Sequence, residues 1–389
     1  MRAPAAVLTL LALLPAPARA EENPGVSAAP ILQMTPGARA SGMGSAFTAV
    51  ADDLSALHFN PAGLSNLDHR NVNFTYLKGF QDQSVEHIAA ATPLPFAGVI
   101  GNGYTTLAAG LTLAQNGKIE VNRTNADGSF RDTRSLNAGG DLVASVGFSE
   151  RALESTFEGK GRPVTLRHFI GVGAKYVRST LAEQYSASAW GGDLGYQLRC
   201  PELGVSFGAA AQNFGTQMKF IEEGDPLPLT FRTGFAYFLP LDLLETPPSQ
   251  SVLFSLDGDY LYYERTPHAN IGVEYSAMRM YHLRLGYQIH RDVAGLTFGF
   301  GLAWRGLGVD YAWALNDALG DIHRFGLTWR FGKVSARTRE RPSRPYIESM
   351  PESEDLDEIE KKTPELLDEP TKPRRRASDY DKGAPGWIY

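Results

Sequence analysis

The 389-residue chain has a single cysteine, Cys200, which excludes an internal disulfide framework. It has no surplus of basic residues, because 37 Lys and Arg stand against 43 Asp and Glu, and the formal net charge is −6. No predicted strand or helix carries a basic stripe, so we expect no nucleic-acid partner. The eight histidines are scattered without metal-ligand spacing, and we predict no metal site and no other cofactor.

Long apolar runs are also scarce, and the longest lies at the start of the chain. Arg2 is followed by the apolar run from Ala5 to Leu14, and Ala18-Arg19-Ala20 has the small-x-small form of a cleavage site. Residues 1–20 are therefore predicted to be a signal peptide that is removed on export. No cysteine stands directly after the cleavage site, which argues against a lipoprotein anchor. Beyond it, no run of about eighteen apolar residues predicts a membrane helix. The exported chain would be periplasmic, secreted or a β-barrel.

Glycine and aromatic residues are abundant, with 40 Gly, 20 Phe and 16 Tyr, which favours β structure with many turns. The segment 281–290 alternates strictly. One face would carry Tyr281, Leu283, Leu285, Tyr287 and Ile289, and the other His282, Arg284, Gly286, Gln288 and His290. A period of two places each set on one face of a strand.

The same pattern recurs along the chain in segments of about ten residues separated by turn residues. It predicts about fourteen strands: 71–79, 84–94, 104–115, 141–150, 167–179, 186–199, 203–214, 230–240, 251–263, 268–278, 280–290, 296–305, 307–316 and 322–332. An even number suits a single-chain bacterial barrel.

Alternation alone fits both a soluble sandwich and a membrane barrel. Strands of about ten residues are long enough to cross a bilayer when they are tilted. Trp304 and Trp329 end their segments at one rim, and Trp190 and Trp313 lie near the other, as in an aromatic girdle. The opposite strand face carries glycine, alanine and charges of both signs, namely Asp257, Asp259, Glu274, Arg284, Arg305 and Asp310. We therefore predict a transmembrane antiparallel β-barrel in a bacterial outer membrane, in contact with its lipid.

An even strand count returns both termini to the periplasm. Three short connections, 199–202, 278–279 and 305–306, are predicted as tight periplasmic turns. Residues 116–140 and 215–229 are predicted as external loops, and 151–166 and 241–250 as longer periplasmic connections. The barrel would span 71–332, followed by a disordered, charged periplasmic tail over 333–389.

Residues 21–70 are rich in small residues and lack the strand pattern. Glycines such as Gly42 and Gly44 would let backbone approach backbone inside a narrow lumen. Asp52 and Asp53 are predicted to begin a short helix through His58, which Pro61 would end. We predict that residues 21–70 form a plug in the barrel lumen.

One stretch of this segment carries a family resemblance. The run GARA-x-GMG-x-AF-x-AVADD-x-x-A-x-x-x-NPAGL, followed by repeated β segments, resembles the PorV/PorQ family within the FadL-like superfamily of outer-membrane barrels. The resemblance implies a fourteen-stranded barrel with an inner amino-terminal segment, in which Asn60, Pro61, Ala62 and Gly63 match the NPAG element. It also implies either passage of hydrophobic small molecules or a role in type IX secretion as a partner of secreted proteins.

Three short motifs suggest chemistry but have simpler explanations. Gly204-Val205-Ser206-Phe207-Gly208 matches the G-x-S-x-G nucleophile motif, yet its flanking residues continue a strand, so no catalytic residue and no enzyme activity is predicted. Gly42-Met43-Gly44 lacks the third glycine of a nucleotide fingerprint. Asn125-Ala126-Asp127-Gly128 lacks the later glutamate of a calcium loop and is predicted to be a turn.

Function stays open between several hypotheses. Asp257, Asp259, Glu274, Arg284 and Asp310 are candidates to line a lumen, and mutual neutralisation within a plugged barrel is at least as good an explanation. The protein would be a conduit for hydrophobic small molecules, a partner in secretion, or a sealed structural barrel. The tail, ending in Gly386-Trp387-Ile388-Tyr389, is either a solvated linker or a docking arm.

Overall fold

The computed structural model describes residues 25–79, 82–94, 98–101, 103–159, 162–241, 249–289, 295–315 and 320–333. The predicted signal peptide over 1–20 and the tail beyond Lys333 lie outside the described residues, as does most of the predicted connection 241–250.

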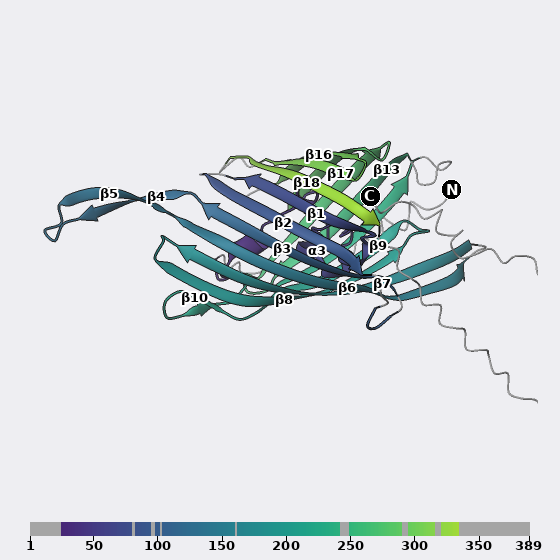
Figure 1. Ribbon diagram of the computed structural model, residues 1–389, viewed down its shortest axis with the longest axis horizontal. Coiled ribbons are helices and arrows are strands. Elements are labelled where there is room, and N and C mark those ends of the chain that lie inside the picture. The colour runs from purple at the N-terminus through teal and green to yellow at the C-terminus, as the bar shows by residue number, and fades with distance from the viewer. Residues whose placement is uncertain are drawn as a thin grey trace, which may run out of the picture.

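Fourteen antiparallel strands close into a barrel in which β1 pairs with β18 (Figure 1). Chain neighbours pair throughout, apart from two short hairpins that interrupt the order. The barrel strands are β1 (His69–Lys78), β2 (Gln83–Leu94), β3 (Thr105–Asn116), β6 (Gly139–Gly159), β7 (Arg162–Leu181), β8 (Tyr185–Cys200), β9 (Val205–Gly215), β12 (Thr230–Pro240), β13 (Gln250–Leu261), β14 (Thr266–Ala277), β15 (Tyr281–Ile289), β16 (Leu296–Trp304), β17 (Leu307–Ala314) and β18 (Ile322–Lys333). The predicted all-β, fourteen-stranded barrel is confirmed.

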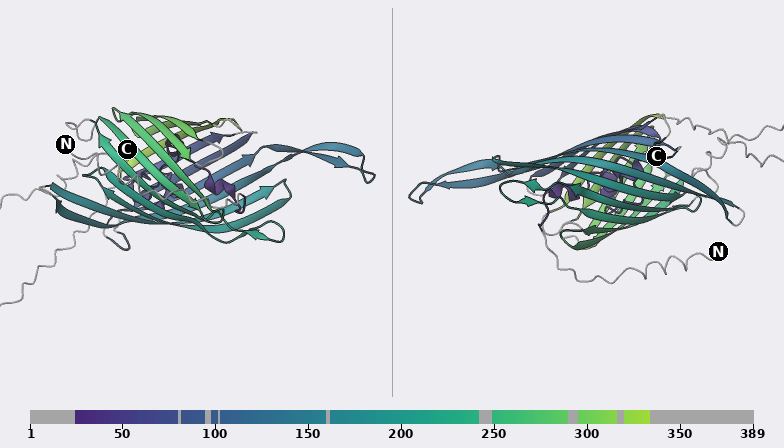
Figure 2. Two further views of the ribbon diagram at one scale, coloured as in Figure 1. Left: turned by 180° about the vertical axis from the view of Figure 1, so that it is seen from behind. Right: turned by 90° about the horizontal axis from the view of Figure 1, so that it is seen from below.

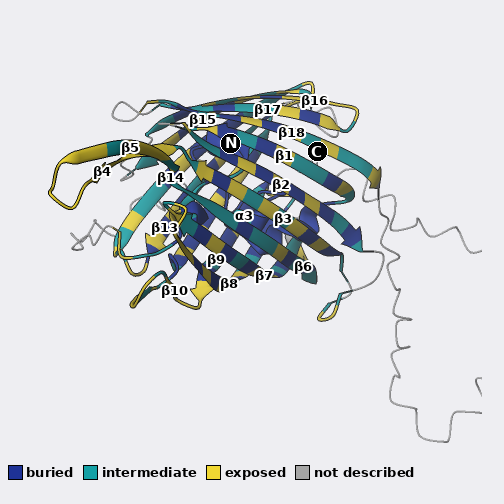
Figure 3. Cartoon of the chain, turned by 60° about the vertical axis from the view of Figure 1, so that its left-hand side comes forward, coloured by how far each residue is buried: buried dark blue, intermediate teal, exposed yellow. Residues whose placement is uncertain are grey.

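The apolar face of each strand points outward. In β15, Leu283 and Leu285 are about half exposed, whereas Arg284 between them is 5% exposed. This alternation of exposed and buried residues runs along the other barrel strands (Figure 3). In a closed barrel with no free edge, an apolar exterior over a polar interior is the arrangement that lipid requires. The chain is therefore a transmembrane β-barrel of the outer-membrane class.

The strand connections define two rims. β1 begins and β18 ends at one end of the barrel, because His69 pairs with Lys333, and we call this end the terminal rim. The turns 201–204, 278–280 and 305–306 also lie there. The first of them was predicted over 199–202, but Arg199 and Cys200 still belong to β8. The opposite end, called the loop rim, carries the connections 117–138 and 216–229.

The tryptophans divide between these rims. Trp304 ends β16 and Trp329 pairs with Leu307, so both lie near the terminal rim. Trp190 pairs with Tyr176 and Trp313 with His323, toward the loop rim. The predicted division of these four tryptophans between the two ends of the barrel is confirmed. Arg305, in contrast, does not face the interior: it lies in an exposed turn with its guanidinium over the Trp304 ring at 5.0 Å.

Two predicted connections contain strand. Residues 151–159 and 162–166 belong to extensions of β6 and β7 beyond the terminal rim, and the register shifts between Arg151 and Leu153. This β-bulge breaks the alternation of the sequence, so that prediction was wrong. At the loop rim, β4 (Lys118–Thr124) and β5 (Phe130–Asn137) form a ribbon that projects from the barrel (Figure 1). The two-residue strands β10 (Met218–Lys219) and β11 (Gly224–Asp225) pair within the connection 216–229 of the same rim.

Residues 29–67, which we call the inner segment, contain four short helices. These are η1 (Pro30–Gln33), α2 (Ala38–Gly42), α3 (Ala56–Phe59) and η2 (Pro61–Asn66). The helix predicted from Asp52 to His58 starts only at Ala56, because the Asp53 carboxylate accepts a hydrogen bond from Ser55 N and forms a turn before it. Pro61 follows the end of α3, and it also opens η2. Among the described residues, no helix is both long and apolar enough to cross a membrane.

The lipid-facing assignment can be tested with arginine substitutions. Leu285→Arg places a charge on the exposed apolar face midway along β15, and we expect it to lower the free energy of unfolding in bilayers by about 2–4 kcal/mol. Val121→Arg, on the projecting ribbon, should change it little. Urea titration followed by heat-dependent gel mobility measures both. Equal effects of the two substitutions would contradict the assignment.

Candidate functional site

The inner segment is buried against inward-facing residues from most of the barrel strands. Its helices contact β3, β6, β7 and β8 on one side of the barrel and β15 to β18 on the other. Figure 2 shows the purple amino-terminal helices enclosed by strands when the molecule is turned. None of its helices exceeds six residues, so much of its backbone lacks a helical partner.

Asn60 is fully buried, and its side chain joins the inner segment to the barrel by hydrogen bonds that we call the Asn60 anchor. Its side-chain amide donates to Thr48 O at 3.1 Å and Tyr196 O at 2.9 Å, and its Oδ1 accepts from Ala62 N at 3.1 Å. The Ala62 carbonyl in turn accepts from Ser149 Oγ at 2.7 Å. An amide side chain can donate and accept at once, which the position requires.

The remaining NPAG residues fit closely around this anchor. Pro61 and Ala62 backbone atoms pack on Gly171 of β7, where a Cβ would collide with them. A side chain on Gly63 would collide with the carbonyl of Ala51. The motif therefore brings backbone against backbone, both within the inner segment and against the surrounding ring of barrel strands, which we call the wall.

Gly42 and Gly44 make the corresponding approach on the opposite wall. A Cβ on Gly42 would lie 2.9 Å from the Cα of Gly299 in β16. Gly44 has φ +63°, a left-handed conformation that favours glycine, and its N–H donates to Thr297 Oγ1 at 3.0 Å. The predicted close packing at these two glycines is present.

Asp257 binds the inner segment through backbone amides. Its Oδ2 accepts from Phe47 N at 2.8 Å and from Thr48 N at 2.7 Å. Asp259, two residues along β13, instead accepts from Arg232 at 3.2 Å and Asn270 at 3.0 Å. Asp257 thus bonds the inner segment directly, whereas these two bonds of Asp259 go to the neighbouring strands β12 and β14.

Glu274, Arg284 and Asp310 belong to one charge network together with Arg39 of α2. Arg39 bonds both oxygens of Glu274 at 2.9 Å, and Arg284 bonds Glu274 and Asp310 at 2.6 Å each. Charge-assisted, bidentate pairs of this kind are among the stronger hydrogen bonds in proteins. The network ties the inner segment to β14, β15 and β17.

The Arg39 guanidinium also forms ion pairs with Asp52 and Asp53. Its Nη1 lies 2.5 Å from Asp52 Oδ1 and 3.2 Å from Asp53 Oδ2. Burial raises the pKa of the Asp53 carboxyl, while Arg39 opposes the rise and Asp52 adds to it. Arg39 thus links two separate stretches of the inner segment to the wall.

Several wall residues that hold the inner segment were not predicted. Gln197 and Ser206 donate to Ala49 O at 2.7 and 2.9 Å, and Arg199 donates to Val50 O. Arg324 donates to Thr35 O at 3.2 Å and Ser41 Oγ at 2.8 Å. Their inward position in alternating strands was the available signal. Their partners, far away in the chain, could not be inferred.

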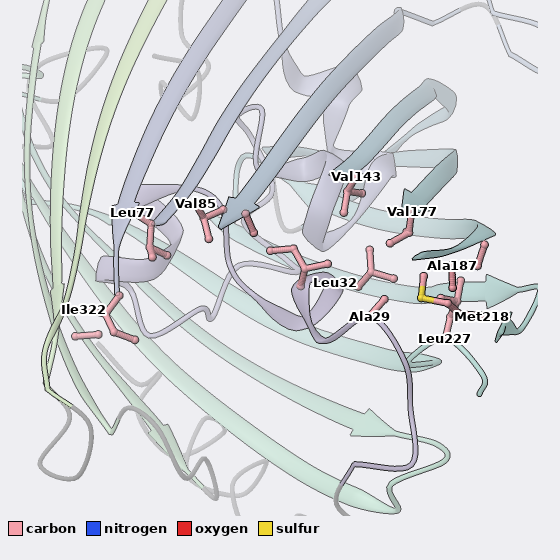
Figure 4. Close-up of a cluster of buried hydrophobic side chains, with 14 residues drawn as sticks. Ala29, Leu32, Leu77, Val85, Val143, Val177, Ala187, Met218, Leu227 and Ile322 are labelled. Carbon is pink, nitrogen blue, oxygen red and sulfur yellow. The ribbon is translucent and has the colours of Figure 1, made fainter. Parts of the chain in front are cut away.

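On the loop-rim side of the inner segment lies an apolar pocket. Its apolar lining includes Ile31, Leu32, Leu57, Leu77, Val85 and Val143. A few polar groups complete it, among them His87, Thr112 and Lys175, and Lys175 is paired with Asp193 at 2.9 Å. Figure 4 shows Leu32 between inward side chains of the wall, in a band running from Leu77 toward Met218.

On the terminal-rim side lies a second, charged pocket, which we call the vestibule. It is lined by Arg39, Asp52, Asp53, Glu274, Arg284 and Arg330, and by polar residues of strand ends. Leu54 lines both pockets. The inner segment therefore separates an apolar compartment from a charged one.

The remaining sequence motifs take the simpler form that was predicted. Ser206 lies within β9 and donates to the Ala49 carbonyl, without the strand–turn–helix geometry of a nucleophile. Asn125 to Gly128 form the turn between β4 and β5, in which Gly128 N donates to Asn125 O at 3.0 Å. Within the described ranges, no group of three or more His, Cys, Asp or Glu residues could hold a metal ion.

A model of an uncharacterised protein family, UPF0164, matches residues 17–126. No curated protein matches the chain. Solved structures similar to it include a deltaS2 mutant of the TodX monoaromatic hydrocarbon channel, at 14% identity and TM-score 0.47, covering 77% of this chain and 98% of that one. The P. putida toluene transporter TodX follows at 13% and 0.45, covering 76% and 98%. A Pseudomonas aeruginosa FadL homologue has 11% and 0.39, covering 77% and 98%.

The Asn60 anchor can be tested by alanine substitution. Asn60→Ala leaves the buried carbonyl of Thr48 and the part-buried carbonyl of Tyr196 without this donor, and we expect the free energy of unfolding to fall by about 2–4 kcal/mol. Asn122→Ala, which removes one exposed hydrogen bond from Thr133 in the ribbon, should cost little. Urea titration compares them. A loss at Asn60 no larger than at Asn122 would refute the anchor.

Proposed function

We propose that this protein is an outer-membrane conduit for small hydrophobic molecules, with the inner segment acting as its plug. The apolar pocket above the inner segment carries this proposal. Pockets for small molecules are concave and mostly apolar, with a few polar groups that orient the ligand. The lining from Ile31, Leu32, Val85 and Val143 has this character, and it lies inside a membrane barrel.

The chemistry of the pocket favours a neutral or largely apolar ligand. The buried Lys175 that lines it already pairs with Asp193 and bonds Asn213 at 2.9 Å. His87 is bonded to Thr112 at 2.8 Å. A charged ligand would lose its hydration here without gaining an ionic partner, whereas an apolar ligand loses nothing comparable.

The proposal includes an orientation of the barrel in the outer membrane. The loop rim, with its projecting ribbon, would face the exterior, and the terminal rim, with its tight turns, the periplasm. Both chain ends would then be periplasmic, after removal of residues 1–20, and residues 333–389 would extend into that compartment. Ligand would enter the apolar pocket from the loop rim and pass the inner segment near Asn60 or Leu54.

Blocking the apolar pocket tests the proposal. Val143→Trp fills it from β6, and Val146→Trp places the same ring on the lipid-facing side of the same strand. We expect cells with the first variant to take up radiolabelled toluene or hexadecanoic acid at the level of cells lacking the protein. The second variant should behave as the wild type.

Folding has to be separated from blockage in this test. Heat-dependent gel mobility verifies that each variant forms the barrel. Val143→Ala enlarges the pocket instead of filling it, and we expect uptake at or above the wild-type rate. Normal uptake by folded Val143→Trp, or no difference between wild-type cells and cells lacking the protein, would overturn the conduit.

A second candidate function is that of a secretion partner, as the resemblance to the PorV/PorQ family suggests. The ribbon β4–β5 favours it, because it projects from the barrel with exposed residues on both faces, including Phe130. Deletion of 118–137 should then remove co-purifying secreted proteins and leave the barrel folded. The same deletion should not affect uptake of hydrophobic molecules through the pocket.

A further inference from the structure

We propose that residues 52–57, which we call the gate, are the only part of the inner segment that moves when a ligand passes. The remainder would stay bound to the barrel wall. This inference rests on the proposed conduit, and it identifies the residues whose movement opens the path for the ligand.

The two pockets meet at the gate. Leu54 is 4% exposed and lines both the apolar pocket and the vestibule. Leu57 lines the apolar pocket only, while Asp52, Asp53 and Ser55 line the vestibule only. Displacement of these six residues would join the two compartments into one path.

Hydrogen bonding to the wall is distributed unequally along the inner segment. On one side of the gate, the backbone at Gly44, Phe47 and Thr48 bonds to Thr297 and Asp257. On the other side, carbonyls or amides of residues 58–66 bond to Gln212, Ser149 and Gln197. Within the described part of the chain, residues 52–57 make no hydrogen bond to any barrel strand.

The gate is held by apolar contacts with the wall and by ion pairs to Arg39 of the inner segment. Leu57 packs on glycines of the wall, with its Cδ1 3.5 Å from the Cβ position of Gly110 and its Cδ2 2.7 Å from that of Gly147. Asp52 and Asp53 bond Arg39, which belongs to the inner segment. Moving the gate would therefore break the ion pairs to Arg39 and apolar contacts, and weaken the attraction of Asp52 to Arg199 and of Asp52 and Asp53 to Arg330, but it would break no hydrogen bond to a barrel strand among the described residues.

A disulfide across the vestibule can lock the gate. The Cβ position of Gly37 lies 3.4 Å from Ser55 Cβ, close to the 3.5–4.5 Å or so that disulfides span. Gly37→Cys with Ser55→Cys, in a Cys200→Ser background, would tie the gate to the start of α2, which lies outside residues 52–57. Both positions line the vestibule, so oxidant and reductant can reach them.

A matched control cross-links α2, outside the gate, to the wall. The Cβ position of Gly326 in β18 lies 3.3 Å from Ala38 Cβ in α2, and both residues also line the vestibule. Ala38→Cys with Gly326→Cys therefore creates a similar bond, which leaves residues 52–57 free. This control separates motion of the gate from release of the whole inner segment.

We expect oxidised Gly37→Cys/Ser55→Cys protein to reduce toluene uptake in cells to the level without the protein, and dithiothreitol to restore it. Oxidised Ala38→Cys/Gly326→Cys protein should take up toluene as the wild type does. Mass spectrometry confirms each cross-link. Normal uptake with the first lock, a block by both locks, or failure of only the first pair to cross-link would overturn the gate. No uptake by the wild type would overturn the conduit, and the gate with it.

Discussion

The structure depends on one constraint, which is that the inner segment cannot satisfy its own backbone. Its helices are too short to pair most of their amides and carbonyls, and buried unpaired groups are costly. The barrel supplies the missing partners from inward side chains, such as Asp257 for two amides and Gln197 for a carbonyl. Polar residues inside the barrel are therefore part of the packing of the inner segment.

The exterior obeys the complementary constraint. Lipid offers no hydrogen bonds, so every strand must pair on both edges and the sheet must close. Closure leaves a lumen, and glycines on inward positions decide how closely the inner segment can approach its wall. Gly299 against Gly42 and Gly171 against Pro61 are two such places, on opposite sides of the barrel. Between them, the region around Leu54 relies on apolar contact and on the ion pairs of Arg39.

Much of this fold could be predicted from the sequence because lipid imposes a strict period of two. Strands such as β12 were predicted with the bounds that the structure has. The extension of β6 was missed because a bulge at Ala152 shifts the alternation. Asn60 was identified from a motif, whereas Arg39 was not, since its partner Glu274 lies 235 residues away. Pairing at that distance leaves no local signal.

Amide hydrogen exchange of the full-length protein in lipid nanodiscs tests the central claim most directly. If the barrel wall holds the inner segment, the amides of Phe47 and Thr48 should exchange about as slowly as those of the barrel strands. Amides of residues 52–57 should exchange faster than these. Rapid exchange over the whole of residues 38–66 would contradict the account, because it would mean that the wall does not hold the inner segment.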